Sequence, residues 1–150
     1  MTRQELHMTR EELQGIAERY VETWKRRDSA AIAQYFASDA VAESPMYATL
    51  RGRKAIDDAF RAFFTSFPDA TLEIDAILVD PPRVAIFTTV NATHVNEFFG
   101  MPGTNRHIEF RIARLLEMND EGLMMLERRI YDFTGLLVQI GILRARPAKP

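Results

Sequence analysis

The order of the expected elements constrains the fold of this chain more than any single motif does. Apolar residues recur at helical spacing in two long segments, residues 9–26 and 54–67, with a short helix and a short strand over residues 40–43 between them. Apolar and polar residues then alternate through four long segments before a closing helix: residues 70–79, 83–95, 106–118 and 123–132, then 133–143. Strands that follow one another without intervening helices favour an α+β fold with a largely antiparallel sheet.

Local signals predict where the helices begin and end. Thr9, with Glu12 three residues later, has the form of a capping box. Asp28 or Ser29 can cap the short second helix, because short polar side chains accept from the first free backbone N–H groups. Pro68 stops the third helix.

Composition excludes several classes of function. A chain of 150 residues suits one domain, residues 1–150. With 19 Lys and Arg against 21 Asp and Glu, it has no basic footprint for nucleic acid. The absence of cysteine rules out disulfides and a thiol nucleophile. No apolar stretch is long enough for a membrane span, and residues 1–10 lack a signal core, so we expect a cytoplasmic protein.

Several short motifs occur in one order along most of the chain. They are Arg51-Gly52-Arg53 before the third helix, Phe67-Pro68-Asp69 after it, and then Thr93-His94, Phe99-Gly100-Met101-Pro102-Gly103, Asn105-Arg106, Asp120-Glu121-Gly122, Tyr131-Asp132 and Gln139-Ile140-Gly141. Over residues 10–143 this order resembles the SnoaL-like polyketide and ester cyclases of the NTF2-like superfamily. The resemblance implies a cone-shaped α+β barrel, in which a strongly curved, mostly antiparallel sheet wraps around the N-terminal helices and encloses a pocket.

The resemblance also implies a chemistry. Characterised cyclases of this family close polyketide rings by intramolecular aldol condensation without a cofactor, using an Asp as acid/base. Asp132 is the position that matches this Asp, and His94 matches the histidine of the family's Gly-Thr-His-Thr-Gly segment, although its neighbours differ. Many relatives dimerise through the outer face of the sheet, so we expect a homodimer and no cofactor.

Two interpretations of Asp132 follow from its place between a strand and a helix. Alternation puts it on one strand face with Met124, Leu126, Arg128 and Ile130. If this face lines the pocket, Asp132 is placed as a general acid/base. The alternative is an N-cap for the closing helix, a favoured position for Asp.

His94 shares a face with the apolar residues of its strand. It could orient Asp132 or donate to a developing oxyanion. The alternative is a buried histidine bonded to the backbone. Three histidines spread along the chain match no metal motif, so we expect no metal.

Aromatic side chains and charges complete the candidate residues. We expect four aromatics to contact the substrate, although packing in the core is the common role of such residues: Tyr20, Trp24, Tyr47 and Phe63. Five charges on the last two strands are expected to form cross-strand pairs on the outer surface: Glu109, Arg111, Arg114, Arg128 and Arg129.

The sequence thus predicts a SnoaL-like enzyme that binds a hydrophobic carbonyl compound and performs cofactor-free acid/base catalysis, either aldol-type cyclisation or isomerisation. The alternative is a non-catalytic ligand-binding or dimerisation module, because this superfamily uses the fold for both purposes. Epoxide hydrolysis of the limonene type is disfavoured. That family pairs two Asp with an Arg, whereas residues 93–98 offer His94 and Glu97.

Overall fold

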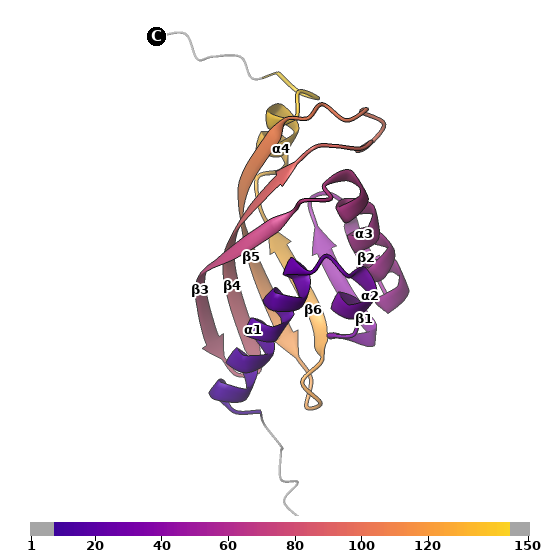
Figure 1. Cartoon of the computed structure of the whole chain (residues 1–150). Helices are drawn as coiled ribbons and strands as arrows, with labels where there is room; N and C mark the ends of the chain where they lie inside the picture. Colours follow the sequence, from indigo (N-terminus) through magenta and orange to yellow (C-terminus); the bar gives the residue numbers. More distant parts are fainter. Residues whose placement is uncertain (1–7, 145–150) are drawn as a thin grey trace, which may run out of the picture.

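The computed structural model describes residues 8–144. Residues 1–7, which include His7, and residues 145–150 lie outside the described residues. The elements in chain order are α1 (Arg10–Lys25), α2 (Ser29–Ala33), β1 (Phe36–Ser44), β2 (Ala48–Arg51), α3 (Arg53–Ser66), β3 (Thr71–Asp80), β4 (Arg83–Thr93), β5 (His107–Met118), β6 (Met124–Ile130) and α4 (Phe133–Gln139) (Figure 1). The expected order of helices and long strands is confirmed. Strand β2 was not expected, because its four residues are too exposed to show an apolar alternation.

The strands form a single six-stranded sheet in the order β2-β1-β6-β5-β4-β3. Strands β1 and β6 run parallel, and the other neighbouring pairs are antiparallel. The prediction of a largely antiparallel sheet is therefore confirmed. The parallel pair places the first strand of the chain beside the last one, so residues far apart in sequence build the same wall.

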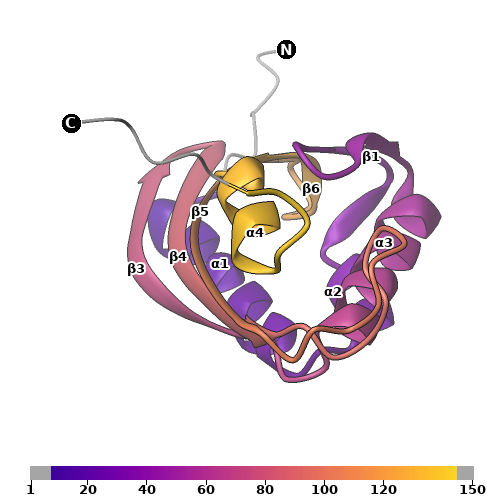
Figure 2. The ribbon, with the colours of Figure 1, turned by 90° about the horizontal axis from the view of Figure 1, so that it is seen from above.

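The sheet is curved, and helices occupy its concave side (Figures 1 and 2). Helix α1 packs against β3 and β4, while α3 packs against α2 and β1. Helix α4 lies at the end of the sheet where β5 begins and β6 ends (Figure 1). None of the helices within residues 8–144 combines the length and apolar character needed to cross a bilayer.

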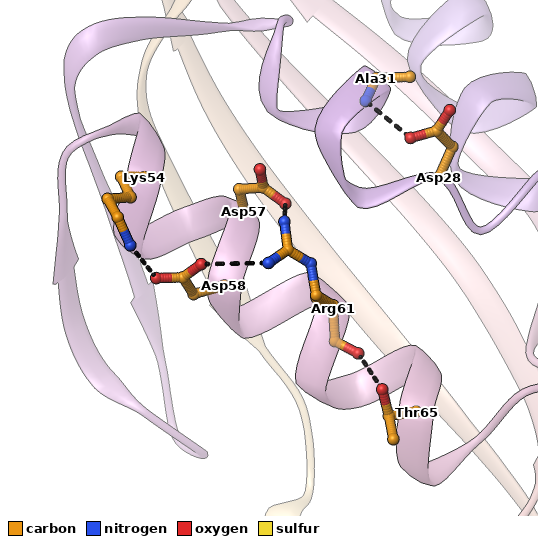
Figure 3. Close-up of polar contacts among 7 residues, drawn as sticks. All are labelled: Asp28, Ala31, Lys54, Asp57, Asp58, Arg61 and Thr65. Carbon is orange, nitrogen blue, oxygen red and sulfur yellow. Dashed lines mark hydrogen bonds and ion pairs between the residues drawn. The ribbon is translucent and has the colours of Figure 1, made fainter.

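Side chains at the ends and on the outer faces of the helices explain why these segments are helical. Thr9 Oγ1 accepts a hydrogen bond from Glu12 N at 3.1 Å. Figure 3 shows the second cap, in which Asp28 Oδ1 accepts a hydrogen bond from Ala31 N at 3.1 Å. These bonds satisfy N–H groups that have no partner inside the helix. On the outer face of α3, Lys54 pairs with Asp58 and Arg61 with Asp57 (Figure 3). Because these charged side chains lie on the outer face of α3, its aromatic face can pack in the core.

Strand β6 turns the opposite face inward from the one the sequence analysis favoured. Glu127 and Arg129 are buried, whereas Arg128 is exposed and Ile130 is 60% exposed. Met124 is buried as expected, but the pairing register shifts between Met124 and Leu126. A bulge of this kind reverses which residues point to the core. Arg128 and Ile130, on the strand face that the acid/base interpretation of Asp132 required to line the pocket, therefore point outward.

The expectation that the charges of β5 and β6 all lie outside was wrong for two arginines. Arg114 is 4% exposed and Arg129 is 9% exposed, and both contact the buried Glu127. The Arg128 side chain does lie outside, where its Nε is 2.7 Å from Glu43 Oε2. Partners on other strands allow charge to be buried on β5 and β6, and alternation alone cannot reveal such partners.

Backbone contacts hold the loop between β4 and β5 closely against the end of β4. His94 N donates to Arg106 O at 2.9 Å, and Asn105 N donates to His94 O at 2.8 Å. Gly103 lies so close to Val95 that a Cβ atom added there would stand 1.8 Å from the Val95 carbonyl oxygen. Only glycine permits this approach.

We predict that Gly103→Ala destabilises the protein by about 2 kcal/mol or more, because the methyl group must displace backbone. Gly15→Ala is the matched control. Its Cβ would meet only the flexible end of Arg19, at 3.2 Å, in the middle of α1. It should stabilise the protein by about 0.5–1 kcal/mol, since alanine favours a helix. Urea denaturation measures both changes, and equal effects of the two substitutions would contradict this account.

Candidate active site

A cavity of about 40 Å³ lies between the helices and the concave side of the sheet. Its residues come from α1, α3, β1, the β1–β2 turn, β4, β5, β6 and the segment after β6. Most of its wall is aromatic or aliphatic. Five residues bring polar atoms or charge to it besides Ser44: Trp24, Tyr47, Arg114, Arg129 and Tyr131.

One buried carboxylate organises the charged side of the cavity. Glu127 is 0% exposed, and its Oε2 accepts a hydrogen bond from Tyr20 Oη at 2.6 Å. Its Oε1 accepts a hydrogen bond from Arg129 Nε and lies 3.5 Å from Arg114 Nη1. These contacts join α1, β5 and β6 through side chains.

Electrostatics keep Glu127 ionised. Burial by itself raises the pKa of this carboxyl group, because it disfavours the charged form. The guanidinium groups of Arg129 and Arg114, with the Tyr20 hydrogen bond, outweigh burial and hold the pKa below its ordinary value of 4.5. Burial and the Glu127 charge raise the pKa of Tyr20, so its hydroxyl remains a donor. Glu127 is therefore a structural anion and a weak base.

Several donors at the cavity have no hydrogen-bond partner. They are Trp24 Nε1, Arg114 Nε and Nη1, and Arg129 Nη2. Each guanidinium group is held over an aromatic ring, Arg129 at 4.7 Å from the centroid of Phe60 and Arg114 at 5.9 Å from that of Trp24. Buried donors without a partner are costly, so they mark a place prepared for an acceptor.

Two tyrosines stand at the half-buried side of the cavity. Burial raises the pKa of Tyr47 and of Tyr131, so both hydroxyls stay protonated at neutral pH. Tyr131 Oη is 3.0 Å from Ser44 Oγ. None of the described residues that line the cavity carries a carboxyl group. The cavity therefore presents hydrogen-bond donors and positive charge, which suits an oxygen that carries or develops negative charge.

The predicted aromatic contacts separate into two groups. Trp24, Tyr47 and Phe63 line the cavity. Tyr20 does not belong to the lining, because its hydroxyl is turned to Glu127 behind the cavity wall.

Asp132 lies outside this cavity. Its side chain is exposed and accepts a hydrogen bond from Gly135 N at 2.8 Å, as an N-cap of α4. The residue before it, Tyr131, does line the cavity. The capping geometry of the alternative interpretation is thus present, and the catalytic role remains a prediction.

His94 lies deep in the protein, at 0% exposure, and does not line the cavity. Its Nδ1 is 3.0 Å from Thr104 Oγ1 and accepts from Thr104 N at 3.4 Å, while its Nε2 has no hydrogen-bond partner among the described residues. Its ring packs against Phe67 and Phe98. Within residues 8–144 no hydrogen bond joins His94 to Asp132, so a helper role through direct contact has no support.

The sequence analysis missed four residues that give the cavity its chemistry: Arg114, Glu127, Arg129 and Tyr131. One signal was available for Arg114, because it interrupts the apolar inner face of β5 between Ile112 and Leu116. No comparable signal existed on β6, because the bulge interrupts the alternation of inward-facing and outward-facing residues along this strand. The residues from 8 to 144 contain no group of three or more His, Cys, Asp or Glu that could hold a metal ion.

The chain is an α+β protein with a curved six-stranded sheet (Figure 2) and a cavity beneath its helices. It belongs to the SnoaL-like polyketide cyclase family, whose model matches residues 14–140. The resemblance inferred from the sequence is thereby confirmed. No match was found among curated proteins.

Solved structures agree with the fold. AclR from Streptomyces galilaeus, described as a candidate hydroxylase, is 26% identical with a TM-score of 0.81, over 93% of this chain and 91% of its own. A candidate SnoaL-like polyketide cyclase from Jannaschia sp. CCS1 is 15% identical with a TM-score of 0.80, over 98% and 99%. A Catenulispora acidiphila protein with a ketosteroid isomerase-like fold is 17% identical with a TM-score of 0.71, over 88% and 97%. The predicted fold class is confirmed.

We predict that Glu127→Gln destabilises the protein by about 3 kcal/mol at pH 7, because it leaves two buried guanidinium groups without an anion. The difference from the wild type should shrink as the pH falls below 4.5. A carboxyl group whose pKa is depressed by folding loses its stabilising effect when it is protonated. Urea denaturation between pH 7 and pH 3 measures this.

Glu43→Gln is the control, because Glu43 pairs with Arg128 on the surface, where such pairs contribute about 0–1 kcal/mol. A Glu127→Gln effect that stays constant across the pH range would show that the Glu127 charge does not stabilise the fold.

Proposed function

We propose that this protein is a small-molecule enzyme that binds a hydrophobic carbonyl compound in the cavity and acts on it by cofactor-free acid/base chemistry. Aldol-type ring closure is the first candidate, and isomerisation of a ketone through its enolate is the second. One observation carries the proposal: an aromatic cavity whose polar groups are donors or cations. Both reactions develop negative charge on a carbonyl oxygen, which such groups stabilise.

The apolar walls and the hydrogen-bond donors of the cavity would contact different parts of the substrate. The rings of Phe60 and Phe63 offer apolar contact to the body of the substrate. The hydroxyl groups of Tyr47 and Tyr131 are available to the carbonyl oxygen, and Arg114 adds positive charge nearby. Donors fixed in a buried site need little reorganisation as charge develops.

Asp132 is the proposed acid/base. It directly follows Tyr131, whose ring lines the cavity, so a substrate that extends from the cavity can reach it. Glu127 is the less suitable base, because its oxygens are already engaged by Tyr20 and Arg129 and its pKa is lowered.

His94 is proposed as an indirect helper. Through Thr104 it holds the loop between β4 and β5, and Phe99 of this loop packs against Phe133 at 6.0 Å. Phe133 is the first residue of α4, next to Asp132. His94 therefore acts on the orientation of α4 and its cap rather than on the substrate.

A non-catalytic ligand-binding module is the alternative function. Two observations favour it. None of the described residues that line the cavity carries a carboxyl group, and Asp132 forms a capping hydrogen bond. Both functions require ligand binding, but only the enzyme exchanges protons with its ligand.

Deuterium exchange at the α-carbon of 2-acetonaphthone, followed by NMR in D₂O, tests the catalytic proposal. We predict that the wild type accelerates the exchange and that Asp132→Asn lowers the rate about 100-fold, the scale of one general base. Asn caps helices about as well as Asp, so stability should be unchanged. Asp132→Ala should lose the activity and about 1 kcal/mol of stability.

If Asp132→Asn retains full exchange, Asp132 is only a cap. If the wild type binds the ketone but does not accelerate exchange, the ligand-binding module is the correct function.

Homodimerisation through the outer sheet face is part of the proposal. Phe87, Ala113 and Ile130 stand opposite one another on adjacent strands and form an apolar row, with Phe87 40% and Ile130 60% exposed. Such a row across several strands is typical of an interaction surface.

We predict a dimeric mass in light scattering after gel filtration, and a shift to monomer for Ile130→Glu, which puts a charge into the apolar row. Leu143→Glu, at an exposed apolar residue beyond α4, should leave the dimer intact. A monomeric wild type would contradict this part of the proposal.

A further inference from the structure

The buried charges beside the cavity do not balance. Arg114 and Arg129 carry two positive charges, and Glu127, which contacts both, carries one negative charge, so one positive charge remains. All three side chains are at least nine-tenths buried. A buried charge without a counter-ion is strongly unfavourable, because it has lost its hydration without gaining a partner. A ligand with one negative charge would remove this cost.

The unpartnered donors lie where such a ligand would bind. Arg114 Nε, Arg129 Nη2 and Trp24 Nε1 belong to residues that line one cavity, and none of these three atoms has a hydrogen-bond partner. Arg114 Nη1 faces Glu127 Oε1 at 3.5 Å. The rings of Trp24 and Phe60 hold the two guanidinium planes. Planar guanidinium groups match the two oxygens of a carboxylate.

Cavity size and charge select among anions. A volume of about 40 Å³ holds about three water-sized groups, which corresponds to the three heavy atoms of a carboxylate. A dianionic phosphate is larger and would reverse the charge imbalance. A simple inorganic anion would make no use of the aromatic side of the cavity, where the rings of Phe110 and Tyr131 pack with their centroids 5.5 Å apart.

Space for the rest of such a ligand adjoins the cavity. A more open groove of about 610 Å³ beside α3 shares Tyr47 with the cavity. Tyr47 packs against Phe99 there, at 5.8 Å. An aromatic body can therefore continue from the cavity along Tyr47.

We propose that the substrate of this site is a hydrophobic carboxylic acid, bound as its anion with the carboxylate at Arg114, Arg129 and Trp24 and the apolar body toward Tyr47 and Tyr131. This assignment rests on the proposed function in taking the cavity as the substrate site, and it names the substrate class. The reacting carbonyl group is then a second group on the same molecule, on the side of the two tyrosines.

Calorimetric titration of the wild type at pH 7 with 2-naphthoate and with 2-naphthamide tests the proposal without any substitution. The two probes have nearly the same shape, and only the first is an anion. We predict that 2-naphthoate binds about tenfold or more tightly than 2-naphthamide, as expected for hydrogen bonds to a charged group. Equal affinities would overturn the proposal.

Two substitutions with opposite effects test the charge argument. Arg114→Met leaves Glu127 paired with Arg129, so the cluster becomes neutral; the protein should fold as stably as the wild type and lose the preference for 2-naphthoate. Glu127→Gln increases the positive charge, so 2-naphthoate should bind more tightly although the protein is less stable. A preference that survives Arg114→Met overturns the proposal.

Arg128→Met is the matched control, because Arg128 lies on the outer face of the same strand as Arg129. It should leave the preference unchanged, and a loss there would mean that overall charge, not this cluster, attracts the anion. Preference for 2-naphthoate without ketone exchange would retain the carboxylate site and reject the proposed catalysis. Ketone exchange without that preference would retain the proposed catalysis and reject the carboxylate site.

Discussion

The ion cluster around Glu127 is the interaction on which the rest of the structure depends. It connects the first helix, through Tyr20, to the two strands that carry Arg114 and Arg129. A buried carboxylate is unfavourable unless every oxygen has partners, and here both oxygens do. The cluster therefore specifies how α1 must lie on the sheet, since a shifted helix would leave the carboxylate oxygen bonded by Tyr20 without that donor.

The same cluster gives the cavity its chemical character. Its carboxylate is turned away from the cavity and its guanidinium groups remain beside it, so the cavity has donors without a base. The proposed acid/base, Asp132, is thus separated in space from the buried donors, since Asp132 is exposed and Trp24 and Arg114 are buried. This separation is the physical reason for placing the reacting part of a substrate near Tyr131, between the two.

Membership of the SnoaL-like family describes the scaffold more closely than the chemistry. The structural relatives include a candidate hydroxylase and a candidate cyclase with nearly the same TM-score, so the shared fold does not by itself name the reaction. In this chain, Arg114 on β5 and Arg129 on β6 bring positive charge to the cavity. They lie on the curved sheet itself, where neighbouring strands hold side chains more firmly than a loop does.

The sequence by itself determined the order of the elements, the cap at Thr9 and the fold class, because helical periodicity, strand alternation and capping act over a few residues. It narrowed the cap of the second helix to Asp28 or Ser29, and the structure decided for Asp28. The sequence also identified Trp24, Tyr47 and Phe63, which line the cavity. Only the tertiary structure decided that Glu127 and Arg129 face inward. That outcome depends on a bulge in β6 and on partners such as Tyr20, 107 residues away, which no local pattern records.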